Sequence, residues 1–424
     1  MTQHVAIVGA GPGGLATALR LAGQGYRVDL FESADRVGGR MGGLQSGPYH
    51  FDTGPTILQM PQLYDQLFAS AGLNRADYIA FTRLDLYTRL RFWDQSQLDL
   101  TADLAVLKGQ LAKFRSDLPA AMDRWIADQA ERYAVGYGPY LSEPARPLRG
   151  YLRLDELPAV LSFRPWESLY QHFWNAFGDD RLVYALSYPA KYLGMHPTLS
   201  ASVFSLIPYL EMAFGVWHPQ GGFRTLAQAI AQAIQDTGGQ IHLNTPVRQV
   251  WHRNGQARGI ELATGERVAA DAVVVNADFA QAVQTLIPPE GRGKYSREYF
   301  AQQQFSCSTF MLYLGLDKRY DRPHHQIYLS DHVRRRDRPF VDDSALDQVD
   351  PPFYVCNPTV TDSSSAPEGH STLYLLVPIP HTGYGVDWPN TLKPYRDFMV
   401  NRLSLLGFED LEAHIVTAVS YTHL

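Results

Sequence analysis

The sequence is short of cysteine, of net charge and of long apolar runs. Its two cysteines, Cys307 and Cys356, lie far apart and form no Cys-x-x-Cys pair, which argues against a disulfide scaffold, a zinc ribbon or a dithiol redox motif. The formal net charge of the 424 residues is −6, whereas nucleic-acid-binding proteins usually carry a basic excess. We therefore expect no nucleic-acid partner and a reducing, cytoplasmic setting.

No stretch reaches the roughly 18 uninterrupted apolar residues that a membrane-spanning helix needs. The N-terminus also lacks the basic start and the longer apolar region of a secretory signal, because a polar-flanked strand begins by His4. Apolar residues nevertheless make up 45% of the chain, which is enough for a substantial core. At ~150 residues per domain, the length predicts two or three domains. The expected protein is intracellular, either soluble or attached peripherally to a membrane.

The N-terminal pattern predicts a β-α-β unit. His4–Val8 and Val28–Phe31 are short apolar runs typical of strands, and Leu15–Ala22 between them places apolar residues at helical spacing. A mostly helical pattern fills 61–215, and strands are expected again over 240–275. A nucleotide-binding start is thus interrupted by a long insertion, which indicates two interleaved domains.

The turn after the first strand carries a dinucleotide-binding fingerprint. Gly9-x-Gly11-x-x-Gly14 opens the helix, and Glu32 follows 23 residues after Gly9, at the end of the second strand. Gly9 permits the tight turn, Gly11 lets the backbone approach a pyrophosphate, and Gly14 lets helix and strand pack closely. The carboxylate of Glu32 would accept hydrogen bonds from ribose hydroxyls and repel a 2′-phosphate, which disfavours NADP.

The fingerprint alone does not distinguish FAD from NAD. Val37-Gly38-Gly39-Arg40 lies just beyond Glu32, where a guanidinium can reach back to the pyrophosphate. No second Gly-x-Gly-x-x-Gly follows a later strand, as a shuttle from NAD to flavin would require. Both features favour FAD.

These residues and several later motifs together resemble a known family. The block from Val5 to Arg40 resembles the flavin-containing amine oxidase superfamily. Over about residues 4 to 418 the chain is similar, more specifically, to the bacterial-type carotenoid (phytoene) desaturases, in the motifs Phe51–Thr56, Tyr192–Gly194, Gly215–Gly222, Val274–Asp278, Ser308–Gly315, Thr361-Asp362 and Ala366–His370.

The resemblance implies one non-covalent FAD and a long polyene substrate, which loses pairs of hydrogens on the course from phytoene towards lycopene. It also implies the cofactor contacts, residue by residue: Gly9, Ala10, Gly11, Gly13 and Gly14 at the phosphates, Glu32 and Ser33 at the adenosine ribose, Arg40 at the pyrophosphate, Gly54, Pro55 and Thr56 at the isoalloxazine, and Val247 on the adenine side. No catalytic acid or base is assigned, because no arrangement follows from spacing alone.

On this basis we predict an α/β fold in which a Rossmann-like FAD-binding domain is interleaved with a helix-rich, mixed-sheet substrate domain. The FAD domain is predicted from 1–60 and 216–290. The substrate domain is predicted from a membrane-facing insertion at 61–215 and from 291–424. Nothing after Asp278 supplies the late glycine-rich strand and helix that the family places at the flavin, so we expect a C-terminal FAD segment to be missing.

A polyene hydrocarbon is insoluble in water, so the resemblance also predicts peripheral attachment to the membrane that holds the substrate. His196–Trp217 carries one formal charge, Glu211, and is either a docking patch or a buried helix pair. The aromatic residues of 163–217 either line a polyene tunnel or form ordinary helical core. The single fingerprint favours a quinone or molecular oxygen as electron acceptor, and the oligomeric state stays open.

Three other functions remain as alternatives. A carotenoid cis–trans isomerase could use the same scaffold without net oxidation, and a small-amine oxidase would turn over soluble substrate. A non-enzymatic prenyl-lipid carrier would resemble the Rab escort and dissociation-inhibitor proteins, which lack flavin. The intact glycine loop with Glu32 and Arg40 argues against the carrier.

Two polar features are interpreted as structural. Adjacent histidines on an extended strand point to opposite faces, so His324-His325 predicts no metal site. Asp52, beside Gly54-Pro55, is expected to fix a turn rather than to act as a general base.

Overall fold

The computed structural model describes residues 3–137, 161–189, 195–303, 307–334, 349–379 and 386–422. The chain divides into two compact units, each assembled from separate stretches. The first unit comprises Met1–Arg83, Trp217–Gln304 and Ser364–Pro367, and the second comprises Leu84–Val216, Phe305–Ser363 and Glu368–Leu424. The chain thus passes from one unit to the other at 83/84, 216/217 and 304/305, and again on both sides of Ser364–Pro367. The sequence suggested boundaries at 60, 215 and 290. The motif Tyr192–Gly194 lies outside the described residues.

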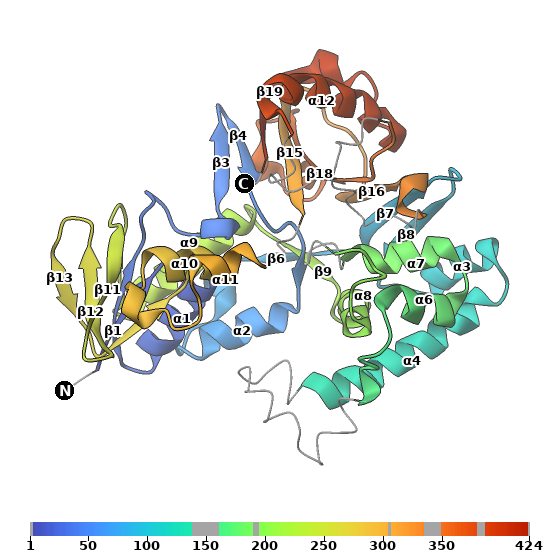
Figure 1. Cartoon of the computed structure of the whole chain (residues 1–424). Coiled ribbons are helices and arrows are strands. Elements are labelled where there is room, and N and C mark those ends of the chain that lie inside the picture. Colours follow the sequence, from blue (N-terminus) through green and yellow to red (C-terminus); the bar gives the residue numbers. More distant parts are fainter. Residues whose placement is uncertain are drawn as a thin grey trace. The chain divides into compact units, whose positions relative to one another are not determined.

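The first unit contains a four-stranded parallel sheet, of which Figure 1 labels strand β1. Its order is β10-β2-β1-β14, with the strands spanning Gln240–His242, Arg27–Phe31, His4–Val8 and Ala272–Val275. The central strand β1 pairs with strands far along the chain, since Val5 lies opposite both Val28 and Ala272. Both predicted strands of the β-α-β unit and the α/β class are confirmed.

Alternation along β1 places its side chains in two apolar layers. Val5 and Ile7 pack with α1 (Pro12–Gly23) and α9 (Phe223–Asp236). Ala6 and Val8 pack instead against Ile260 and Leu262, because successive strand residues point to opposite faces. Those two residues belong to an antiparallel sheet of β11 (Val247–Arg253), β12 (Gln256–Leu262) and β13 (Arg267–Ala269).

Short elements complete the first unit. They are η1 (Gly39–Met41), β3 (Gly43–Ser46), β4 (Tyr49–Asp52), β5 (Leu58–Gln59), α2 (Pro61–Ala69), η2 (Arg75–Asp77), β6 (Phe81–Leu84), β9 (Val216–Pro219), α10 (Phe279–Thr285), η7 (Pro289–Gly291) and α11 (Arg297–Ala301).

The second unit is built on a seven-stranded mixed sheet of order β19-β15-β18-β17-β16-β7-β8. The strands are β7 (Leu86–Phe92), β8 (Gln97–Thr101), β15 (Ser308–Leu316), β16 (His325–Leu329), β17 (Phe353–Cys356), β18 (Ser371–Ile379) and β19 (Ile415–Thr422). Among its described residues, the α-helices are α3 (Leu104–Phe114), α4 (Leu118–Gly136), α6 (Leu169–Phe177), α7 (Asp180–Ser187), α8 (Leu206–Phe214) and α12 (Trp388–Arg402). The mixed sheet and the helix-rich insertion agree with the predicted class.

One part of the insertion is not helical. Strands β6, β7 and β8 occupy much of 81–101, a region that the sequence pattern assigned to helix. The signal was present in the sequence, where Leu90 and Phe92 alternate with Arg89 and Arg91. In the structure Leu90 and Phe92 are buried and the two arginines are half-buried. Apolar alternation of period two indicates a strand.

The two faces of the large sheet differ in character. Phe310, Leu312 and Leu314 of β15 pack against α12. The other face carries a row of rings that we call the aromatic row, formed by Tyr313, Tyr374, Tyr354 and His325. Neighbouring ring centroids in this row lie 5.2, 6.0 and 5.8 Å apart. The row crosses β15, β18, β17 and β16 in order.

Candidate dinucleotide site

The phosphate loop lies between β1 and α1 and is closely packed on one side. Gly9 has φ +99°, and a Cβ there would lie 2.3 Å from the carbonyl oxygen of Asn276. A Cβ on Gly14 would lie 2.1 Å from the Gly9 oxygen. Only glycine fits these two positions, as the fingerprint predicts.

The same loop is open at its central glycine. Gly11 has ordinary extended backbone angles, with φ −70° and ψ 174°. A Cβ there would meet one protein atom within 4 Å, the side-chain nitrogen of Asn276 at 3.0 Å. Helix α1 starts directly after it with Pro12 in the first turn and no side-chain cap, so its amides and dipole suit a phosphate. The absence of a side chain at Gly11 therefore leaves a cradle that fits a pyrophosphate.

A second glycine turn packs against this loop. The Gly38 N–H donates to the carbonyl oxygen of Ala10 at 2.9 Å. Gly39 has φ +50°, and its Cβ position is 3.1 Å from the Cα of Gly11. These contacts bring Arg40 to the phosphate loop, with its guanidinium 88% exposed and 3.5 Å from the carboxylate of Asp278. The charge of Arg40 is thus accessible to an anionic ligand.

The Gly54–Thr56 segment is attached to the same turn. A Cβ on Gly54 would overlap the carbonyl oxygen of Arg40, and the Thr53 hydroxyl donates to the Gly42 oxygen at 3.1 Å. Pro55 is exposed and Thr56 is half-buried. The structure therefore brings this segment, Arg40 and the phosphate loop together.

Glu32, at the end of β2, holds the neighbouring loops in place. One carboxylate oxygen accepts the Ala10 N–H at 2.8 Å. The other accepts the Ala34 N–H at 2.9 Å and the Ser33 hydroxyl at 3.1 Å. The carboxylate is thus a structural acceptor for the phosphate loop, a role that the sequence pattern did not predict.

Val247 begins β11, next to the loop that leads from β10. In that loop the Thr245 N–H donates to the carbonyl oxygen of Glu32 at 2.8 Å and the Asn244 N–H to that of Ala34 at 2.9 Å. Val247 itself is half-buried against the core that contains Phe31. This position at the end of β2 is compatible with the adenine side.

Asn276 is a site residue that the spacing argument missed. Its N–H donates to the Val8 oxygen at 2.8 Å, and its side chain lies under Gly11, Gly13 and Gly14. The available signal was the Val274–Asp278 motif, which entered only as part of the family resemblance. Because β14 lies beside β1, the residue that follows β14 becomes the floor of the phosphate loop.

Asp52 anchors a helix, which extends the predicted turn-fixing role. Its two carboxylate oxygens accept the N–H groups of Phe223 and Arg224 at 2.9 and 3.1 Å, at the start of α9. Gly222, with φ +85°, allows the approach, since a Cβ there would lie 2.6 Å from the carboxylate. Burial raises the pKa of Asp52, although both backbone hydrogen bonds and the nearby His218 and Arg224 oppose that rise.

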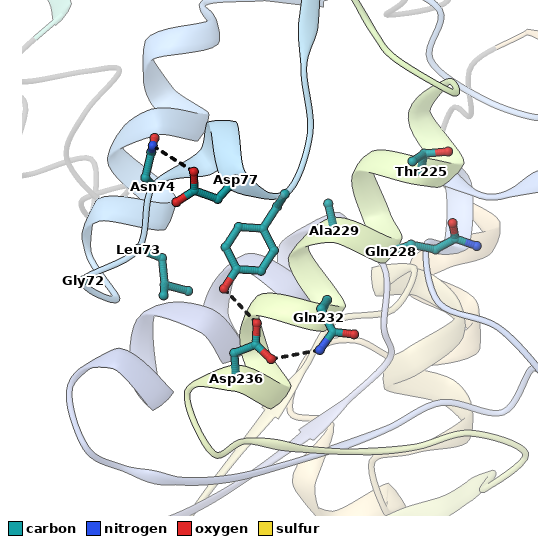
Figure 2. A pocket seen from close by; sticks show the side chains of 10 residues that line it. Gly72, Leu73, Asn74, Asp77, Thr225, Gln228, Ala229, Gln232 and Asp236 are labelled. Carbon is teal, nitrogen blue, oxygen red and sulfur yellow. Dashed lines mark hydrogen bonds between the residues drawn. The ribbon is translucent and has the colours of Figure 1, made fainter. Parts of the chain in front are cut away.

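A large hollow in the first unit lies away from these residues. It has a volume of about 830 Å³ and is lined by residues of the α2–β6 connection and of α9 (Figure 2). Its polar groups engage one another: Asp236 accepts from the Tyr78 hydroxyl at 2.8 Å and from Gln232 at 2.9 Å. None of the predicted cofactor residues lines it, so it is not part of the dinucleotide site.

Comparison with known proteins identifies the family. Residues 12–390 match the family described as flavin containing amine oxidoreductase. The chain is 47% identical over 419 residues to an all-trans-zeta-carotene desaturase of Myxococcus xanthus, covering 97% of this chain and 79% of that protein. The chain belongs to the carotenoid desaturase family, within the flavin-containing amine oxidoreductases. The predicted family and FAD as cofactor are confirmed.

A further relative supports this family, and a solved structure shares the fold. A zeta-carotene-forming phytoene desaturase of Myxococcus xanthus is 34% identical over 416 residues, covering 97% of this chain and 79% of that protein. The crystal structure of an oxidoreductase from Methanosarcina mazei covers 99% of this chain and 88% of its own, with a TM-score of 0.63 and 18% identity. Members of the carotenoid desaturase family are oxidoreductases, and the glycine cradle of this chain fits the FAD that such enzymes use.

Proposed function

We propose that the chain dehydrogenates a linear carotene, with ζ-carotene as its substrate on the course from phytoene towards lycopene. The phosphate cradle of Gly9–Gly14 with Arg40 is the observation that supports this proposal most directly. The chain that contains the cradle is 47% identical to a protein named for ζ-carotene and 34% identical to one named for phytoene. Removing two hydrogens from an unactivated carbon–carbon bond requires an electron sink, which bound FAD supplies.

The residues of the second unit support an apolar substrate. The aromatic row is fully buried or nearly so, with Tyr313 and His325 at 0% exposure and Tyr354 and Tyr374 at 6 and 7%. The row lies on one face of the sheet, and α12 packs against the other face. Aromatic side chains can orient a conjugated chain and exclude water from it, which favours reaction at one bond.

The test is a reaction in liposomes that contain either ζ-carotene or phytoene. We expect ζ-carotene to be converted to products that have lost pairs of hydrogens, faster than phytoene is converted. A product of unchanged mass and altered geometry would indicate the isomerase instead. Protein without bound flavin and without turnover would support the carrier.

We propose further that the enzyme binds peripherally to a membrane. No helix among the described residues is long and apolar enough to span a bilayer. The apolar side chains of Trp166, Met195 and Leu199 are 70, 41 and 66% exposed, and we propose that they form the docking patch. The segments that carry it are joined by the Leu169 N–H, which donates to the Ser200 oxygen at 2.8 Å.

This patch overlaps the predicted docking segment His196–Trp217 only at its start. Further along, Glu211 and Met212 are buried, as the helix-pair alternative requires.

In flotation with phosphatidylcholine–phosphatidylglycerol vesicles, Leu199→Lys should bind less well than wild type. Val106→Lys is the matched control, because Val106 is 52% exposed on α3. Equal flotation of all three proteins would contradict docking through this patch.

The proposed electron acceptor is a quinone or molecular oxygen. The support is the single Gly-x-Gly-x-x-Gly loop in the sequence, which leaves NAD without a fingerprint of its own. Reduced enzyme should be reoxidised by a soluble quinone under anaerobic conditions and by oxygen in air. Stoichiometric NADH formation during turnover without quinone or oxygen would contradict this.

A further inference from the structure

A cluster of three buried residues in the second unit has the composition of a metal site. One ring nitrogen each of His324 and His325 and the Sγ of Cys356 all lie within 4.8 Å of one another. The three residues are 3, 0 and 3% exposed. Imidazole and thiolate are the ligands that thiophilic ions such as Zn²⁺ and Cu⁺ prefer.

The sheet explains why these residues meet, and it corrects the expectation that the two histidines diverge. His325 and Cys356 are directly opposite one another on β16 and β17, so their side chains share a face. His324 precedes the first residue of β16, and the alternation rule does not apply to it. The ring centroids of His324 and His325 are consequently only 4.4 Å apart, at an interplanar angle of 54°.

Each imidazole is oriented by a hydroxyl group. The Nδ1 of His324 hydrogen-bonds the Thr361 hydroxyl at 2.9 Å, and the Nδ1 of His325 hydrogen-bonds the Tyr354 hydroxyl at 2.8 Å. The Nε2 atoms of both rings are buried. In metal-ligating histidines one ring nitrogen is commonly held by a polar partner, while the other binds the ion.

We propose that His324, His325 and Cys356 bind one Zn²⁺ or Cu⁺ ion. The thiol of Cys356 loses its proton on binding, so that the thiolate offsets one positive charge of the ion. The ion would fasten the start of β16 to the end of β17, at one end of the aromatic row. It does not involve the FAD loop.

The second cysteine provides a matched control. Cys307 is half-buried and does not belong to the cluster. Cys356→Ser removes the soft ligand with little change in volume, whereas Cys307→Ser leaves the three ligands intact. Thr361→Val removes only the hydroxyl that orients His324, and changes to such supporting partners weaken metal binding by about 10–100-fold.

The experiment uses the full chain with bound FAD, purified without a histidine tag. After treatment with a chelator, the protein is titrated with Zn²⁺ and, under reducing anaerobic conditions, with Cu⁺, and bound metal is measured by elemental analysis. Co²⁺ serves as a third probe, because a thiolate-to-cobalt absorption band reports coordination by sulfur. Flavin content, read from the same samples, shows whether each variant is folded.

We expect one equivalent of Zn²⁺ or Cu⁺ and a thiolate–cobalt band in the wild type and in Cys307→Ser. Cys356→Ser should lose the band and bind at least tenfold more weakly, with unchanged flavin. Failure of the wild type to bind any of the three ions at one equivalent would overturn the proposal. Retention of the cobalt band in Cys356→Ser would overturn it as well.

Discussion

Replacement of Gly11 tests the cofactor site with little disturbance of the fold. The backbone angles of Gly11 suit any residue, and its Cβ would meet only the Asn276 side chain, at 3.0 Å. The branched side chain of Gly11→Val would add bulk to a loop whose backbone a pyrophosphate has to approach closely. The variant should therefore fold and fail to retain FAD.

The size of the effect depends on how many amide hydrogen bonds the pyrophosphate would no longer receive. Hydrogen bonds to a charged group contribute about 1.5–3 kcal/mol each. If the side chain keeps the pyrophosphate from two amide donors, the cost is about 3–6 kcal/mol, which weakens FAD binding by about 10²–10⁴-fold. The thermal midpoint of the flavin-free protein should change little.

The assay combines the flavin-to-protein absorbance ratio with a fluorescence titration of flavin-free protein with FAD. Gly109→Ala is a control that should retain FAD, since its Cβ meets nothing within 4 Å on the exposed side of α3. Gly14→Ala is the opposite control, because its Cβ would lie 2.1 Å from the Gly9 oxygen and should lower the thermal midpoint as well. Undiminished flavin in Gly11→Val would refute the placement of the pyrophosphate.

Three further predictions follow from single contacts. Asp52→Ala removes both hydrogen-bond acceptors at the start of α9 and should lower the free energy of unfolding, measured in urea titrations, by about 1–2 kcal/mol. The control Asp65→Ala, which breaks a half-exposed ion pair, should lower it by less than about 1 kcal/mol. Gly54→Ala should lose both FAD and stability, since the new methyl group would overlap the Arg40 oxygen; a normal flavin spectrum would contradict this. Burial, helped by the charge of Arg132, lowers the pKa of His172 from 6.5 to about 4. The free energy of unfolding should therefore fall by up to about 3 kcal/mol as the pH drops from 6.5 towards 4. In His172→Gln this fall should be smaller, and an unchanged pH dependence of the free energy of unfolding would show that another group controls it.

The features that were predicted well depend on residues close together in sequence. The turn, helix start and acidic strand end of the fingerprint all lie within Gly9–Glu32. Glycine spacing and apolar alternation determine such a unit locally. The structure accordingly shows β1, α1 and β2 where the pattern placed them.

The features that were missed depend on which strands become neighbours. Asn276 reaches the phosphate loop only because Ala272 on β14 pairs with Val5 on β1, which lies near the start of the chain. His325 meets Cys356 only because β16 pairs with β17. Neither pairing leaves a mark on local periodicity, so spacing could not reveal it.

The two carboxylates near the cofactor loops constrain how the enzyme can work. Glu32 accepts the Ala10 and Ala34 N–H groups, and Asp52 accepts those of Phe223 and Arg224. Taking up a proton would weaken these charge-assisted hydrogen bonds and loosen the loops that they hold. Both groups are therefore suited to fixing backbone positions rather than to moving substrate protons. Since bound FAD supplies the redox chemistry, the choice among carotenes has to be made by side chains that contact the hydrocarbon.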